Sequence, residues 1–216
     1  FDLEDEYLIA ALCERKMGIG ADGLILLKEH NTLDFEMIYF NSDGKKSSMC
    51  GNGGRCIIAF AKMLGLIETE TTFMAIDGKH QGKIKEDVVF LQMQDVKEID
   101  SLDDALVLDT GSPHFVTIVD DLKNLDVKAE GKKIRNSEPF KKEGINVNFV
   151  LDNTKLQVRT YERGVEDETL SCGTGAVASS IAFHFLQLTK FNKLKVETSG
   201  GILQVEFKFT SGIYTD

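Results

Sequence analysis

The sequence predicts an α+β fold made of two similar halves whose strands pair mainly antiparallel. Segments with strand patterns outnumber helical ones, and short turns join many of them, which disfavours a doubly wound parallel sheet. Each half also carries one apolar helical segment that follows the same Cys-Gly-x-Gly tetrapeptide, beginning at Cys50 and at Cys172. We expect the halves to span 1–103 and 104–216, because the charged stretch from Asp95 to Asp104 is the best candidate boundary.

Composition places the chain among ordinary globular proteins. It has 216 residues, with 35 acidic and 25 basic side chains, and its formal net charge is −10. Only 2 prolines accompany 19 glycines, without low-complexity segments, so disordered and collagen-like classes are excluded. The acidic balance disfavours nucleic acid as a partner, and apolar runs such as Ile57–Ala61 are far shorter than the roughly 20 residues of a membrane span. The first residue is Phe1 without a signal-peptide pattern, and we expect a chain trimmed at both ends.

The elements of the first half follow from periodicity and turn chemistry. Apolar residues at helical spacing predict a helix over Leu3–Lys16. Asn41-Ser42-Asp43-Gly44 predicts a turn directly after the strand predicted over Asp34–Phe40. The remaining predicted elements are an apolar run over Leu24–Leu27, a strand over Asp34–Phe40, a helix over Arg55–Leu64 closed by Gly65, and strands over Thr71–Ile76 and Val88–Met93 around a polar turn.

The second half shows a similar order of elements. A helix is predicted over Ala176–Leu188, followed by a hairpin around Ser199-Gly200-Gly201. The predicted strands are His114–Val119, Asn146–Val150, Leu156–Tyr161, Leu194–Thr198 and Ile202–Phe209.

The four cysteines are too few for a disulfide scaffold and are not spaced as a zinc site. The four histidines are scattered, so no structural metal is expected. Cys13 and Cys56 fit the ordinary role of a small buried hydrophobe. Cys50 and Cys172 differ because each stands at the start of a predicted helix and is followed by glycines.

A cysteine in that position has a chemical use. The first turn of a helix presents unpaired N–H groups and a dipole that favour a thiolate, and the glycines allow a ligand carboxylate to approach the same N–H groups. Two such sulfurs on opposite sides of one carbon suit inversion of a stereocentre, since one removes a proton while the other donates one. The alternative is that the glycines permit tight packing and the cysteines fill space.

A third glycine-rich segment, Gly18–Gly23, matches the dinucleotide-binding pattern G-x-G-x-x-G. That motif requires a strand before it and a helix after it, whereas here the predicted order is reversed. We therefore interpret it as a structural or substrate-lining loop.

Two further segments are candidate site residues. His114 heads a strand after Gly111-Ser112-Pro113 and is either structural or functional. Glu162 and Arg163 end a strand shortly before Cys172; the arginine suits a carboxylate clamp, and the carboxylate would raise the pKa of a neighbouring thiol. An exposed ion pair is the alternative. Asn41 and Asn146 suit polar substrate groups or turn caps.

Five motifs together resemble the diaminopimelate epimerase family, in the right order and over nearly the whole chain. The motifs are Phe40-Asn41-Ser42-Asp43-Gly44, Met49-Cys50-Gly51-Asn52-Gly53-Gly54-Arg55-Cys56, Gly111-Ser112-Pro113-His114, Tyr161-Glu162-Arg163-Gly164 and Ser171-Cys172-Gly173-Thr174-Gly175-Ala176. The resemblance implies a cofactor-independent, cytoplasmic and usually homodimeric epimerase that interconverts LL- and meso-diaminopimelate for lysine and peptidoglycan-precursor synthesis. It also implies that each half is a sheet wrapped around a central helix, with the active site in the cleft between the halves.

The same resemblance assigns roles to residues. Cys50 and Cys172 would be the acid–base pair, and His114 and Glu162 would tune the thiol pKa values. The implied substrate contacts are Asn41, Gly51, Asn52, Asn146, Glu162, Arg163, Gly173 and Thr174. The sequence departs from the family at Ser112, where many members have Asn, at Gly23, where some have Gln, and in lacking the N-terminal Gly-x-Gly-Asn-Asp-Phe segment.

Other functions remain open at this point. One is a related two-cysteine racemase of proline, hydroxyproline or another amino acid. Another is a cysteine hydrolase that uses Cys172 with His114 as its base, which would need only one cysteine. A third is a binding protein without catalytic activity on the same scaffold.

Overall fold

The computed structural model describes residues 5–47, 50–152 and 155–215, and the chain divides into two compact units, Phe1–Gln92 and Met93–Asp216. This division lies earlier than the sequence boundary at 103/104. The reason is that strand β7 (Ile99–Leu102), within the charged stretch, pairs antiparallel with β8 (Ala105–Asp109) and so joins the second sheet.

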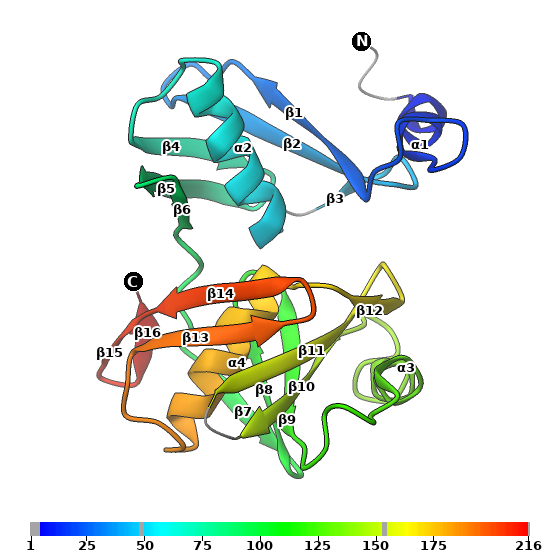
Figure 1. Cartoon of the computed structure of the whole chain (residues 1–216), viewed down its shortest axis with the longest axis vertical. Helices are drawn as coiled ribbons and strands as arrows, with labels where there is room; N and C mark the ends of the chain where they lie inside the picture. Colours follow the sequence, from blue (N-terminus) through cyan, green and yellow to red (C-terminus); the bar gives the residue numbers. More distant parts are fainter. Residues whose placement is uncertain (1–4, 48–49, 153–154, 216) are drawn as a thin grey trace. The chain divides into compact units, whose positions relative to one another are not determined.

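The first unit is a six-stranded sheet with helix α2 packed against it (Figure 1). The sheet order is β1-β2-β4-β5-β6, with β3 paired to β2. The elements are α1 (Glu6–Cys13), β1 (Gly23–Lys28), β2 (Phe35–Asn41), β3 (Lys46–Ser47), α2 (Gly51–Met63), β4 (Glu70–Ala75), β5 (Gly78–Lys85) and β6 (Val88–Leu91).

The second unit is an eight-stranded sheet that curves around helix α4 (Figure 1). Its order is β14-β13-β11-β10-β9-β8-β7, with β12 paired to β11. Besides β7 and β8, the elements are β9 (Pro113–Ile118), α3 (Val127–Arg135), β10 (Asn146–Asp152), β11 (Leu156–Glu162), β12 (Asp167–Thr169), α4 (Gly173–Phe185), β13 (Lys193–Thr198), β14 (Gly201–Glu206), β15 (Lys208–Thr210) and β16 (Ile213–Thr215).

The two units share one connectivity around their central helices. In the first, β1 and β2 form an antiparallel pair, β3 adds to β2, and after α2 the strand β4 pairs parallel with β2 and antiparallel with β5. In the second, β10, β11, β12, α4, β13 and β14 repeat each of these pairings in the same order. The predicted α+β fold with two similar, mainly antiparallel halves is confirmed.

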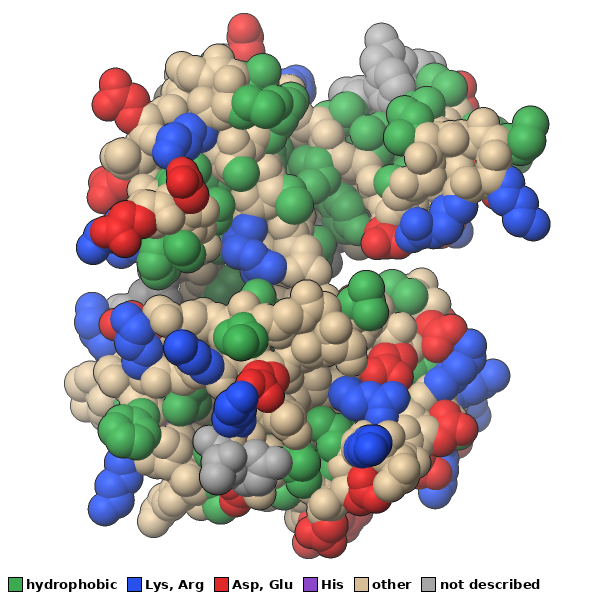
Figure 2. All heavy atoms as spheres, viewed as in Figure 1, with side chains coloured by type: hydrophobic (Ala, Val, Ile, Leu, Met, Phe, Trp, Pro, Cys, Tyr) green, Lys and Arg blue, Asp and Glu red, His purple; other side chains and the backbone are tan. Residues whose placement is uncertain are grey.

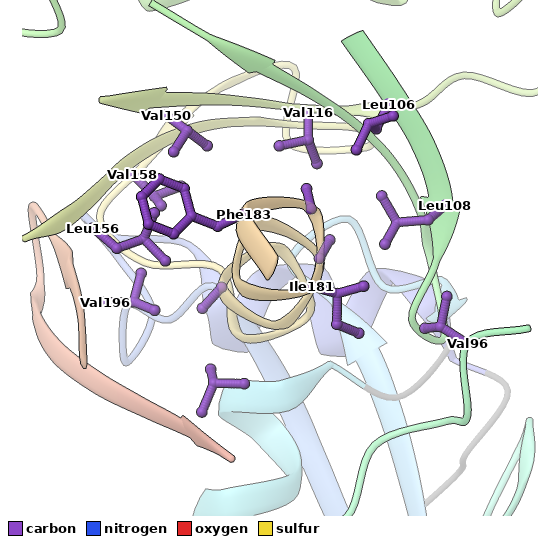
Figure 3. Packing of buried hydrophobic residues seen from close by; sticks show 14 of the residues in the cluster. Val96, Leu106, Leu108, Val116, Val150, Leu156, Val158, Ile181, Phe183 and Val196 are labelled. Atoms are coloured by element: carbon purple, nitrogen blue, oxygen red, sulfur yellow. The ribbon is translucent and has the colours of Figure 1, made fainter. Parts of the chain in front are cut away.

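Each central helix is held by an apolar core. In the second unit, Ile181 and Phe183 of α4 point into a ring of strand residues that includes Val116, Val150 and Val196 (Figure 3). In the first, Ile57 and Ile58 of α2 are buried against the sheet. Burial of each such side chain contributes about 1.5–3 kcal/mol, so the cores hold both helices against their sheets.

Several local predictions differ from the structure. The polar segment predicted as a turn is strand β5, which lies between β4 and β6, and α3 was not predicted. Both central helices begin earlier than expected, so the Cys-Gly-x-Gly glycines lie inside the first turn. Helix α1 is shorter than Leu3–Lys16, whose first two residues lie outside the described part of the chain, and the predicted strand Ile202–Phe209 divides into β14 and β15 at Phe207.

The surface mixes charges of both signs. On the face shown in Figure 2, Lys and Arg side chains are interspersed with Asp and Glu, as the sequence composition suggests. No helix in the part of the chain that the structure describes is long and apolar enough to cross a membrane.

Candidate active site

Cys50 immediately precedes helix α2 of the first unit. The residue is half-buried. The cysteine is the N-cap in extended conformation (φ −107°, ψ 150°), and its sulfur accepts a hydrogen bond from the Gly53 N–H at 3.1 Å. The sulfur therefore lies at the positive end of the helix dipole, where a thiolate is favoured.

The other predicted site residues of the first unit are Asn41, at the end of β2, and Gly51 and Asn52, in the first turn of α2. Asn41 ends β2 and is half-buried, Gly51 is buried, and Asn52 is exposed, with its side-chain oxygen accepting from Arg55 at 2.5 Å. Gly23 is the register partner of Asn41, and a Cβ there would lie 2.4 Å from the Phe40 carbonyl oxygen. No side chain fits at Gly23 without a backbone shift, so this position contributes no polar group.

Cys172 precedes helix α4 of the second unit in the same way. Cys172 is an extended N-cap (φ −117°, ψ 117°), and its sulfur lies 3.4 Å from the Gly175 N–H and 3.3 Å from the Thr174 hydroxyl oxygen. Unlike Cys50, it is buried, with 8% of its surface exposed. The Thr110 hydroxyl donates a hydrogen bond to the Thr174 carbonyl at 3.0 Å and so stabilises this turn.

Glu162 lies at the end of β11 beside the Cys172 thiol and is hydrogen-bonded to it. The Thr169 hydroxyl of β12 donates to Glu162 Oε1 at 2.5 Å and so fixes the carboxylate. Thr169 was not among the predicted site residues. Its place on the strand that pairs with β11 brings it to Glu162, and no local sequence pattern indicates that pairing.

The sequence supports two opposing expectations for the pKa of Cys172: the helix start favours a thiolate, and the Glu162 carboxylate favours a thiol. The surroundings of Cys172 favour the thiol. Burial, and next the negative charge of Glu162, raise the pKa of the Cys172 thiol to about 12, and the hydrogen bonds from Thr174 and Gly175 only partly oppose them. Cys172 is therefore a thiol at neutral pH, suited to donate a proton.

Replacing Glu162 tests this assignment. We expect E162Q to lower the pKa of the Cys172 thiol by about one unit, because the neighbouring negative charge is removed. The pH dependence of Cys172 alkylation by iodoacetamide, quantified by mass spectrometry, measures the change. The exposed Glu138 supplies a control, E138Q, that should leave the profile in place. An unshifted profile in E162Q would contradict the role of the carboxylate.

Asn146 and Arg163 form a second polar group at the same end of the sheet. The Asn146 side-chain oxygen accepts from the Arg163 N–H at 2.9 Å, and its nitrogen donates to the Ser112 hydroxyl at 2.8 Å. The Arg163 guanidinium donates to the Glu143 carbonyl at 3.0 Å. Ser112, at the position where the sequence departs from the family, therefore orients Asn146.

His114 is fully buried at the start of β9, where its register partner on β10 is Asn146. Burial, and next the positive charge of Arg163, lower its pKa to about 3, so the ring is neutral at neutral pH. Its Nδ1 lies 2.8 Å from the side-chain nitrogen of Asn148. Asn148 was also missed in the sequence, although it follows Asn146 by two residues on one strand, and the period of two would have indicated a shared face.

Gly175 is required by the packing of this site. A Cβ at Gly175 would lie 2.4 Å from the Asn148 side-chain oxygen, which is itself fixed by a hydrogen bond, whereas a Cβ at the equivalent Gly53 would meet the Cys50 sulfur and the ends of two apolar side chains at 3.1–3.3 Å. We expect G175A to destabilise the second unit by about 1–3 kcal/mol and G53A to cost less, because both sites gain helix propensity but the strain is larger at Gly175. Hydrogen exchange of each unit measures both; equal costs would contradict the packing argument.

The structure thus groups the predicted residues by unit. Cys172, Glu162, Arg163, Asn146, His114, Gly173 and Thr174 belong to the second unit, and Asn41, Cys50, Gly51 and Asn52 to the first. The segment Gly18–Gly23 follows α1 and ends at the first residue of β1. Its Ile19 and Ala21 N–H groups donate to the Leu12 and Cys13 carbonyls, which supports a structural role. Among the described residues, no group of three or more His, Cys, Asp or Glu side chains is arranged to hold a metal.

Solved structures share this fold at low sequence identity. A PhzF-family phenazine biosynthesis protein from Bacillus anthracis matches with a TM-score of 0.75 at 13% identity, covering 99% of this chain and 84% of that one. A hydroxyproline epimerase from Agrobacterium vitis matches with a TM-score of 0.63 at 14% identity, covering 98% of this chain and 75% of that one. These matches establish the two-unit fold.

The fold and the family comparisons together define an isomerase of the epimerase type. The family model described as diaminopimelate epimerase matches residues 2–97 and 106–214. A diaminopimelate epimerase from Flavobacterium psychrophilum is 51% identical over 219 residues, covering 100% of this chain and 86% of that protein, and one from Chlorobaculum tepidum is 41% identical over 218 residues, covering 96% and 84%. The chain belongs to the diaminopimelate epimerase family.

Proposed function

We propose that this chain interconverts LL- and meso-diaminopimelate through two cysteines, Cys50 and Cys172. The observation that carries the proposal is that two helices in equivalent places each begin at a cysteine whose sulfur caps the helix. Membership of the family, and relatives that bear the name diaminopimelate epimerase, support the substrate and a role in lysine biosynthesis.

The reaction moves one proton off the substrate and one on. In one direction the Cys50 thiolate takes the Cα proton, the bonding electrons remain on Cα next to its carboxylate, and the Cys172 thiol gives its proton to the opposite face. The products are the inverted stereocentre, a Cys50 thiol and a Cys172 thiolate, and exchange with solvent restores the starting forms. No oxidant or reductant is needed. The chemistry requires both sulfurs to flank the same carbon.

The remaining residues have supporting roles in this proposal. Glu162 and His114 tune the thiols, and the helix N-termini at Gly51–Asn52 and Gly173–Thr174 offer N–H groups to the carboxylate of the reacting carbon. Arg163 suits a second carboxylate of the substrate through paired hydrogen bonds. Asn41 and Asn146 supply amide groups for the remaining polar atoms.

Proton NMR in D2O tests the reaction directly. The reduced protein is incubated with LL-diaminopimelate, and loss of the Cα proton signal together with formation of the meso isomer is expected. No exchange would overturn the proposal, and a panel that includes proline and hydroxyproline would then identify a related racemase.

A cysteine hydrolase with His114 as base is disfavoured by the structure. A base must accept a proton, yet His114 is buried with its Nδ1 engaged by Asn148, and its pKa is lowered to about 3. The C50S variant distinguishes the two, because a hydrolase that uses Cys172 alone would keep its activity.

The proposal extends to a cytoplasmic homodimer acting on a small molecule, without nucleic acid or membrane partners. The basis is the usual assembly of the family and the biosynthetic role of its members. Light scattering on the purified protein should give twice the chain mass of 24.0 kDa. A monomeric mass would contradict the dimer.

A further inference from the structure

A buried chain of hydrogen bonds in the second unit runs from Thr160 through Asn148 to His114. Thr160 and Asn148 are register partners on β11 and β10, and the Thr160 hydroxyl lies 3.0 Å from the Asn148 side-chain oxygen. The Asn148 nitrogen lies 2.8 Å from His114 Nδ1. His114 and Asn148 are 0% exposed and Thr160 is 4% exposed, so water does not compete for these groups.

The backbone decides which way the Asn148 amide faces. Its nitrogen also lies 3.3 Å from the Phe115 carbonyl oxygen, which can only accept. The NH2 group must therefore be on this side, and the amide oxygen accepts from Thr160. An NH2 group has no acceptor to offer, so His114 Nδ1 must be the accepting nitrogen of the ring.

The tautomer of His114 follows from that assignment. A neutral imidazole carries its proton on the nitrogen that does not accept, which here is Nε2. Within the described residues, His114 Nε2 is one of two buried side-chain polar atoms without a hydrogen-bond partner. An N–H donor that is fixed but unpaired in the protein is typical of a group that pairs during function.

Asn148 also touches the catalytic turn. Its side-chain oxygen occupies the space of a Cβ on Gly175, whose N–H bonds to the Cys172 sulfur. One side chain therefore contacts both the histidine ring and the first turn of α4.

We infer that Asn148 is a positioning residue that holds His114 as its Nε2–H tautomer, with Thr160 orienting the amide. His114 then offers its Nε2–H as a hydrogen-bond donor and does not act as a proton acceptor. The consequence for turnover rests on the proposed function, whereas the tautomer does not.

Nitrogen NMR of the whole chain labelled with 15N-histidine tests the tautomer. The H114Q variant assigns the signals among the four histidines. At neutral pH we expect His114 to show a protonated Nε2 and an unprotonated Nδ1. A protonated Nδ1, alone or together with Nε2, would overturn the inference, and this reading needs neither substrate nor activity.

Variants test whether the tautomer matters. N148D replaces the donor with a carboxylate, which only accepts, so the His114 proton should move to Nδ1 and kcat should fall about 10–100-fold with KM within about twofold. The exposed Asn192 gives a charge-matched control, N192D, which should change neither. Unchanged kcat in N148D with a moved proton would overturn the positioning role.

A second pair of variants separates orientation from packing. T160V removes the hydroxyl at nearly constant shape and should leave a mixture of His114 tautomers, whereas T160S should restore the Nε2–H form and kcat. Equal behaviour of the two would contradict the role of Thr160. Failure of the proposed epimerisation would show separately, as absent exchange in the unaltered protein whatever its tautomer.

Discussion

Replacing either Cys50 or Cys172 with alanine is expected to lower kcat for epimerisation about 10²–10⁴-fold. In the proposed reaction each sulfur transfers a proton on one face of the substrate, and alanine offers no group that accepts or donates one. Proton NMR of LL- and meso-diaminopimelate in D2O follows both isomers for each variant. Cys56 lies on helix α2 and is exposed, so the expectation that it is a small buried hydrophobe is wrong. C56S is therefore the matched control and should keep full turnover.

The two variants should also differ from one another in solvent exchange. A variant that keeps one thiolate can still remove and return a proton on that face. C50A and C172A should therefore each exchange the Cα proton of only one isomer, and opposite isomers, without inversion. Exchange by C50A should be the slower of the two, because the remaining Cys172 is mostly a thiol at neutral pH. Full turnover in either single variant, or exchange of the same isomer in both, would contradict a two-thiol reaction.

The sequence predicts the parts of this fold that depend on local pattern. The apolar residues of α2 and α4 and the repeated Cys-Gly-x-Gly indicate both central helices and the likeness of the halves. Helix α2 buries one face against its sheet, whereas α4 is buried on nearly all sides. Strand β5 was missed because only alternate residues such as His80 and Ile84 face the core and the others are polar.

Helix α3 was missed for a different reason. It contains Gly131, which weakens a helix in isolation, and here the glycine is required because a Cβ would lie 2.4 Å from the Tyr161 side chain. A tertiary contact thus decides an element that local propensity disfavours.

The candidate site also contains residues that local sequence patterns do not reveal. Motif spacing indicated Cys172, Glu162 and His114, since each lies in a short conspicuous segment. Thr169 and Asn148 reach Glu162 and His114 from neighbouring strands, and strand order and register place them there. The raised pKa of Cys172 likewise depends on burial, which the position of the cysteine at a helix start does not reveal.

His114 is expected to make the second unit markedly less stable in acid. Its pKa is lowered from 6.5 to about 3 by burial and next by Arg163, so the unfolded chain binds the proton more tightly. The stability that the neutral ring contributes is present above pH about 6.5 and is lost as the pH falls toward 3, by about 5 kcal/mol over the whole range and about 2.5 kcal/mol between pH 7 and 4.5.

Comparison with H114Q isolates this contribution. Between pH 7 and 4.5, the free energy of opening, measured by hydrogen exchange of β10 amides, should fall by about 2.5 kcal/mol more in the unaltered protein than in H114Q. Exchange is preferred to a global melting curve because a chain of two units need not unfold in one step. His30 lies in the first unit, so H30Q should leave the pH dependence of β10 as it is. Equal acid sensitivity in H114Q and the unaltered protein would mean that His114 is not buried as a neutral ring. Its role as a hydrogen-bond donor and its exclusion as a catalytic base both depend on that neutral ring.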